Sequence, residues 1–78
     1  MGPRYINRLT HDDVGSRVTV RRWITDAERG LIPSDVVGHL DSWDQGILLV
    51  RRRNGEVVEV REDDILAARV IPARDARD

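Results

Sequence analysis

Cysteine is absent from the 78 residues of the chain, as are lysine and phenylalanine. Without cysteine, the chain can form no disulfide, no thiolate zinc site and no cysteine nucleophile. Small extracellular domains usually depend on disulfides, and this N-terminus carries no apolar targeting segment. The longest purely aliphatic run, Ile47-Leu48-Leu49-Val50, is too short to span a bilayer. We therefore expect a small cytoplasmic domain that does not cross a membrane.

An excess of positive charge is also missing. The chain has 13 basic and 14 acidic residues, for a net charge of −1. General nucleic-acid binders normally carry a basic excess, so the charge argues against that class. Every basic residue is an arginine. This bias is explained either by codon usage in a GC-rich genome or by selection for planar, bidentate contacts.

The side chains that catalysis requires are scarce. Catalysis needs titratable groups that converge in a pocket, and the chain has two histidines and one tyrosine. His39 and Asp41 lie two apart on a predicted strand, and this spacing would place them on one face. The sequence places no nucleophile beside them, and the glycines form no phosphate-binding loop motif. We expect that this chain alone is not an enzyme and binds no metal or cofactor.

Alternating hydrophobicity predicts a series of β-strands. Residues 17–24 form the first clear strand, with Val18, Val20 and Ile24 on one face and Arg22 interrupting that face. Residues 25–35 are rich in polar and helix- or strand-breaking residues, and they predict a loop. In the strand that follows, Gly38 indicates a bulge or a sharp corner. The later strands are predicted at residues 36–43, 47–53, 56–61 and 68–71.

Turn signals connect these strands. Asn54-Gly55 predicts a two-residue type I′ turn, and Asp44-Gln45-Gly46 predicts a second short hairpin connection. Residues 9–15 predict one helical turn, which Thr10 would cap and Gly15 would end. A further tight turn is expected at residues 62–64. The competing interpretation is a two-turn helix over residues 62–69, which is marginal in length.

Together these segments predict an all-β fold, a small five-stranded SH3-like barrel with one or two short helical turns. The barrel would occupy residues 9–72, after a partly ordered leader at 1–8 and before a charged tail or linker at 73–78. The predicted core consists of Val18, Val20, Ile24, Val36, Leu40, Leu48, Val50, Val58, Val60, Ile65 and Val70.

Two groups of side chains are candidates for binding. Arg51, Arg52 and Arg53 are the densest charge in the chain, and Arg21 and Arg22 add to the basic side. These arginines form either a stripe that contacts phosphate or carboxylate groups or a solvated face that is paired with nearby acids.

The two tryptophans form the second group. Trp23 and Trp43 are predicted on the face opposite the aliphatic residues. Exposed aromatic rings stack on bases or prolines, but they also cover barrel ends or dock against a neighbouring domain. Too few aromatic residues are present for a proline-rich peptide groove.

Residues 9–72 resemble a known family. The most telling segments are Asp13-Val14-Gly15, Asp35-Val36-Val37-Gly38, Trp43-Asp44-Gln45-Gly46, Val50-Arg51-Arg52-Arg53-Asn54-Gly55 and Asp64-Ile65-Leu66-Ala67-Ala68-Arg69-Val70. In these segments the chain resembles the SH3-like N-terminal domain of actinobacterial, histone-acetyltransferase-like N-acetyltransferases of the GNAT superfamily.

The resemblance implies a barrel that precedes a catalytic domain. The acetyl-coenzyme A motif of that superfamily, R/Q-x-x-G-x-G/A, is absent from this sequence. We therefore predict a non-catalytic interaction or regulatory module, associated in cis or in trans with an acetyltransferase domain or another protein. The alternative is a small barrel that binds nucleic acid through its arginine-rich face.

Overall fold

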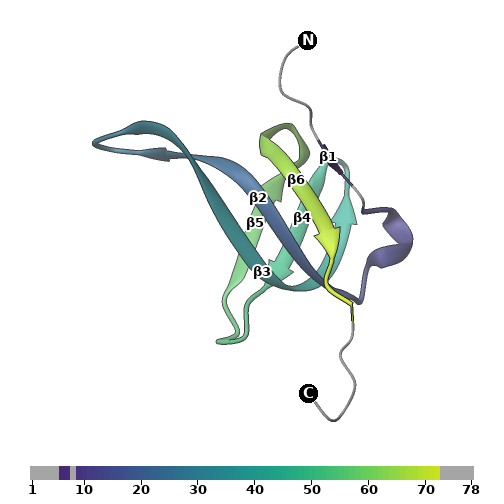
Figure 1. Cartoon of the computed structure of the whole chain (residues 1–78). Coiled ribbons are helices and arrows are strands. Elements are labelled where there is room, and N and C mark those ends of the chain that lie inside the picture. The colour runs from purple at the N-terminus through teal and green to yellow at the C-terminus, as the bar shows by residue number, and fades with distance from the viewer. Residues whose placement is uncertain (1–5, 8, 73–78) are drawn as a thin grey trace.

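One curled β-sheet makes up most of the computed structural model, which describes residues 6–7 and 9–72. The elements are β1 (Ile6–Asn7), η1 (His11–Asp13), β2 (Arg17–Asp26), β3 (Gly30–Asp44), β4 (Ile47–Arg51), β5 (Val57–Arg61), η2 (Glu62–Asp64) and β6 (Ile65–Val70). Their order across the sheet is β1-β6-β2-β3-β4-β5. Strands β2 to β6 pair antiparallel, and the two-residue β1 pairs parallel to β6. The curled strands seen in Figure 1 confirm the prediction of a small all-β barrel with short helical turns.

The leader and tail predicted at residues 1–8 and 73–78 lie mostly outside the described residues. Within the leader, the backbones of Ile6 and Asn7 form β1 and pair with Ala67 and Ala68. The described helical segments are η1 and η2, two 3-10 turns of three residues each. Neither turn is long and apolar enough to cross a membrane.

The core lies between the curled strands. Alternate residues of β2, β3, β4 and β5 point inward, as the period of a half-buried strand requires. The fully buried side chains are Val18, Val20, Val36, Leu40, Leu48, Val50 and Val60, and Leu9, Trp43, Ile65 and Ala68 complete the core. Of the predicted core residues, Val58 and Val70 pack against this cluster while partly exposed. Ile24 is also only half-buried, because it lies beyond the barrel body.

The predicted loop at residues 25–35 is wrong. The β2–β3 pairing continues without a break to Asp26 and Gly30, so most of this segment belongs to a β-ribbon. The side chain of Asp26 makes the turn, because its Oδ1 accepts hydrogen bonds from the backbone N–H groups of Glu28 (2.8 Å) and Arg29 (3.0 Å). The breaker-rich composition therefore marks a tight turn and not a long loop.

We call residues 23–33 the arm, because over this range β2 and β3 have only each other as neighbours. Figure 1 shows the arm projecting from the barrel. Pro33 opposes Trp23 in the arm. The outer edge of β3 has no second strand there, and proline is tolerated on such edges.

The end of the chain also differs from the prediction. Residues 62–64 form η2, and β6 then begins at Ile65, earlier than expected. The competing two-turn helix over residues 62–69 is wrong, because this segment pairs with β2 along most of its length. The β2–β6 register shifts between Arg21 and Arg22. Arg22 extends from β2 to β5, where its Nη1 donates to the backbone oxygen of Glu59 at 3.3 Å.

Candidate binding site

A β-bulge in β3 decides which side chains reach the surface. Leu40 opposes Val50, but the next pair is Ser42 with Leu49, so Asp41 is an extra residue in β3. An inserted residue reverses the faces of the side chains that follow it. The bulge therefore lies after Gly38, at Asp41, and it controls where the rest of β3 points.

Trp43 is buried as a result of this bulge, with 8% of its surface exposed. Its ring stacks on His11 with the centroids 4.1 Å apart, and its indole N–H donates to the carboxylate of Glu62. The prediction that Trp43 lies opposite the aliphatic residues is wrong. Its ring anchors η1 and η2 to the barrel and offers no binding surface.

The bulged Asp41 instead organises an exposed polar cluster. Its Oδ1 lies 2.6 Å from His39 Nδ1 and 3.0 Å from Arg51 Nη2. The hydrogen bond from His39 and then that from Arg51 hold the pKa of Asp41 below its ordinary value of 3.8. Asp41 therefore balances the charge of Arg51. For this arginine, the structure agrees with the interpretation of a solvated face paired with nearby acids.

The β4–β5 turn places the other two arginines of the run. The N–H of Arg52 donates to Glu56 O at 2.7 Å, and the N–H of Gly55 donates to Arg52 O at 2.8 Å. Among the non-glycine residues described, positive φ occurs at Gln45 alone, so Asn54 does not take the conformation that a type I′ turn needs. The predicted two-residue turn is wrong; three residues connect the pair formed by Arg52 and Glu56. The other hairpin turn, between β3 and β4, differs from this one, because both of its central residues, Gln45 and Gly46, have positive φ.

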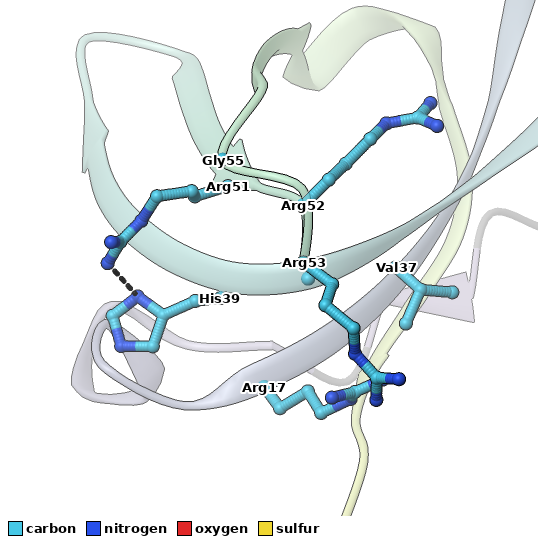
Figure 2. Close-up of a pocket in the computed structure, with 8 residues that line it drawn as sticks. Arg17, Val37, His39, Arg51, Arg52, Arg53 and Gly55 are labelled. Atoms are coloured by element: carbon cyan, nitrogen blue, oxygen red, sulfur yellow. Dashed lines mark hydrogen bonds between the residues drawn. The ribbon is translucent and has the colours of Figure 1, made fainter.

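Around this turn lies a basic hollow of about 380 Å³. Its lining residues are Arg17, Val37, Gly38, His39, Arg51, Arg52, Arg53 and Gly55, as Figure 2 shows. Gly38 lets β3 approach β4 closely, because a Cβ at this position would lie 2.2 Å from Arg51 O. The hollow combines four arginines from β2, β4 and the β4–β5 turn.

Within the hollow, Arg17 and Arg53 differ from the other arginines. Arg51 pairs with Asp41, and Arg52 Nε lies 3.8 Å from Glu56 Oε1. No acid among residues 6–7 and 9–72 pairs with the side chain of Arg17 or Arg53. Both residues line the basic hollow, and in the view of Figure 2 their side chains extend toward the same side of it, below Val37. Two cations that converge without a counter-charge favour an anionic ligand.

Arg17 and Arg53 also line a second hollow of about 720 Å³. Its other lining residues are Gly15, Ser16, Val70, Ile71 and Pro72. The two arginines therefore stand between a basic hollow and one with apolar walls.

The remaining predicted site residues lie elsewhere. Arg21, at the base of the arm, pairs with Asp35, and the shortest contact is 2.9 Å between Arg21 Nε and Asp35 Oδ1. The hydrogen bond from Arg21 lowers the pKa of Asp35. Trp23 is 39% exposed on the arm. Neither Arg21 nor Trp23 lines the basic hollow.

The structure thus divides the six predicted residues into the basic hollow, the arm and the core. Arg51, Arg52 and Arg53 line the hollow, whereas Arg21 and Trp23 belong to the arm region and Trp43 is buried. Sequence reasoning missed Arg17, which enters the hollow because β2 places it opposite His39. The alternation of exposed residues along β2 put Arg17 on the polar face, but only the strand pairing brings it to Arg53.

Comparison with known proteins agrees with this fold. The family described as the Rv0428c N-terminal Sm-like domain matches residues 12–69, from η1 to within β6. No curated protein and no solved structure gives a significant match. The match covers most of the 78 residues, and the chain belongs to the Rv0428c N-terminal Sm-like domain family.

Proposed function

We propose that this domain is a non-catalytic binding module whose basic hollow receives an acidic segment of a partner protein. The observation that supports this most is the convergence of Arg17 and Arg53, which pair with no acid in the described part of the chain. Arginine guanidinium groups bind carboxylate and phosphate oxygens with two parallel hydrogen bonds. A site with two guanidinium groups that have no acidic partner among the described residues is therefore suited to an anion.

The distribution of charge supports a small anionic ligand. The acids of the β3–β4 turn and η2, namely Asp44, Glu62, Asp63 and Asp64, lie at the Ile47 end of β4, where Ile47 pairs with Asp44 and Arg61, whereas the basic hollow lies at the Arg51 end. The backbone N–H of Glu62 donates to Gly46 O at 2.9 Å, which joins two of these segments. Strand β4 runs from this acidic turn to the hollow. The net charge of −1 therefore conceals a basic end that attracts anions and an acidic end that repels a long polyanion.

Nucleic acid is the weaker candidate. Binding of a single strand typically combines a basic groove with aromatic rings on which bases stack. The residues that line the basic hollow include no tryptophan or tyrosine, and Trp43 is in the core. Arg21, which the nucleic-acid hypothesis also requires, is already paired with Asp35.

The resemblance to acetyltransferase N-terminal domains suggests which class of protein the partner belongs to. We propose a GNAT-type catalytic domain, bound in cis or in trans. Pro72, at the end of the described segment, lines the second hollow, which shares Arg17 and Arg53 with the basic hollow. A domain joined after this point would be tethered beside the basic hollow, at high effective concentration. Titration of the labelled chain with a GNAT-type catalytic domain from the same genome tests this, and an absence of shifts around Arg17 and Arg53 would reject it.

The binding role itself is tested with a fluorescein-labelled Asp/Glu-rich peptide. Its anisotropy should rise on titration with the chain, and binding should weaken as salt is added. Arg53→Gln should lower the affinity roughly tenfold, the equivalent of about 1.4 kcal/mol. Arg29→Gln, which removes the same charge from the exposed turn of the arm, is the matched control. Equal loss in both variants would show that only overall charge matters, and tighter binding of an oligonucleotide would favour the alternative function.

A further inference from the structure

We propose that Arg17 and Arg53 form a clamp for one dianionic phosphomonoester group, the kind of group carried by a phosphorylated side chain. The inference rests on the proposed binding role of the basic hollow and names the chemical group that it recognises. The argument depends on charge count, on the geometry of the two arginines and on the hollow next to them.

The charge count comes first. Arg51 and Arg52 each have an acidic partner, whereas Arg17 and Arg53 have none among the described residues. Two positive charges directed to one place repel each other until a counter-charge arrives. A phosphomonoester carries a charge of about −1.5 to −2 at pH 7, which balances both arginines. A carboxylate or a phosphodiester carries a single negative charge and leaves one arginine unmatched.

The positions of the two side chains indicate how the oxygen atoms of the ligand must be arranged. Arg17 comes from the start of β2, and Arg53 comes from the β4–β5 turn, so their guanidinium groups approach from different elements. A planar carboxylate satisfies one fork with its two oxygens. A phosphomonoester has three terminal oxygens arranged in a tetrahedron, and it can accept hydrogen bonds from two forks at once.

The second hollow gives space for the rest of the ligand. Arg17 and Arg53 line both hollows, and the larger one has Val70, Ile71 and Pro72 in its wall. A phosphate held by the two arginines would place its ester oxygen, and the carbon attached to it, beside these apolar side chains. Ser16 adds a hydroxyl group to the same wall. A ligand with a phosphate and an apolar or peptide body therefore matches the site better than free phosphate does.

Phenyl phosphate is a suitable probe, because it joins a phosphomonoester to an apolar ring. The intact 78-residue chain, labelled with ¹⁵N, is titrated at pH 7.5 with phenyl phosphate, with methyl phenyl phosphate and with benzoate. These three anions compare a dianionic monoester, a monoanionic diester and a carboxylate on the same ring. We expect phenyl phosphate to bind at least roughly tenfold more tightly than the other two anions.

Three variants locate the site. Arg17→Gln and Arg53→Gln should each lower the affinity for phenyl phosphate roughly tenfold and remove the preference over the diester. Arg29→Gln removes one arginine from the turn of the arm and should leave both properties unchanged. Amide spectra of all variants establish that the fold is retained.

The outcomes separate this inference from the proposed function. If the acidic peptide binds while phenyl phosphate shows no preference over the diester or benzoate, the phosphomonoester clamp is wrong and the binding module stands. If neither peptide nor phenyl phosphate binds, both are wrong. A phosphoserine peptide that binds more tightly than both its glutamate counterpart and free phosphoserine would place the group on a partner protein. Equal binding of free phosphoserine would instead indicate a small phosphorylated metabolite, with the clamp confirmed.

Discussion

The barrel and the arm are built from the same two strands, yet they are stabilised differently. In the barrel, β2 and β3 each lie between two neighbouring strands, and Val20, Val36 and Leu40 are fully buried. In the arm the same strands pair only with each other, and Trp23 and Leu31 are 39% and 65% exposed. An isolated two-stranded ribbon is at best marginally stable in water. The arm therefore depends on the barrel for its order, whereas the barrel does not depend on the arm.

The largest expected effect comes from comparing two leucine-to-alanine variants, one in the barrel and one in the arm. Leu40→Ala removes a fully buried side chain from the core, and it should lower the free energy of unfolding by about 2–5 kcal/mol. Leu31→Ala, in the arm, should change it by less than about 0.5 kcal/mol. Urea denaturation monitored by circular dichroism measures both. Similar losses in the two variants would show that the arm contributes to the same core.

Gly38 provides the second test, because it lies where β3 approaches β4 under the basic hollow. Gly38→Ala would place a Cβ 2.2 Å from Arg51 O, so one of the two strands must move. We expect a loss of about 1–3 kcal/mol in unfolding free energy, together with amide shifts at Arg51 to Arg53.

The control for Gly38 is a glycine in the arm. Gly30→Ala adds a Cβ that meets nothing within 4 Å, although Gly30 has a φ of +78°. This change should cost roughly 1–2 kcal/mol by backbone strain alone and leave the hollow unperturbed. Shifts in the hollow from Gly30→Ala would contradict the separation of the two regions.

The two tryptophans report on the two regions separately. Trp43 is buried and stacked on His11, whereas Trp23 is partly exposed on the arm. In the Trp23→Phe variant the remaining fluorescence should be blue-shifted and resist acrylamide. In the Trp43→Phe variant it should be red-shifted and readily quenched. Trp43→Phe should also cost about 1 kcal/mol, because it removes the hydrogen bond to Glu62. Equal quenching of the two variants would contradict the burial of Trp43.

The smallest effect concerns the exposed ion pairs. The pKa of Asp41 lies below its ordinary value of 3.8 because of His39 and Arg51. A depressed pKa stabilises the fold above pH 3.8, and this contribution is lost as the pH falls through the folded-state pKa. The small stability advantage of the native chain over Asp41→Asn should therefore be present at neutral pH and disappear at lower pH. The carboxyl pKa values of Asp41 and, at the base of the arm, Asp35 can both be followed by NMR, and a pKa above 3.8 for either would contradict the pairing.

Local sequence pattern predicted the small all-β barrel, most of the core and the helical turn within residues 9–15, where η1 lies, because these depend on alternation and on short-range turn chemistry. It failed where tertiary context decides. The bulge at Asp41 reverses the face of Trp43 without any local signal, since the residues on both sides remain compatible with a regular strand. Residues 25–35 contain loop-forming residues, but the side chain of Asp26 concentrates the turn into a few positions.

The candidate site was predictable only in part, for the same reason. Arg51, Arg52 and Arg53 stand out as a run, and the run does line the hollow. Which arginines remain without an acidic partner depends on the bulge that brings Asp41 to Arg51 and on the turn that sets Arg52 near Glu56. Arg17 is more than thirty positions from Arg53 in the sequence, and only the sheet brings the two together.

The most direct test of the proposed function is to map where an acidic partner binds. The ¹⁵N-labelled chain is titrated with an unlabelled Asp/Glu-rich peptide at low salt, and amide shifts are followed residue by residue. The proposal predicts the largest shifts around Arg17, His39 and Arg53, their loss in Arg53→Gln and their reversal by added salt. Shifts confined to the arm around Trp23 and Leu31, or no shifts at all, would contradict it.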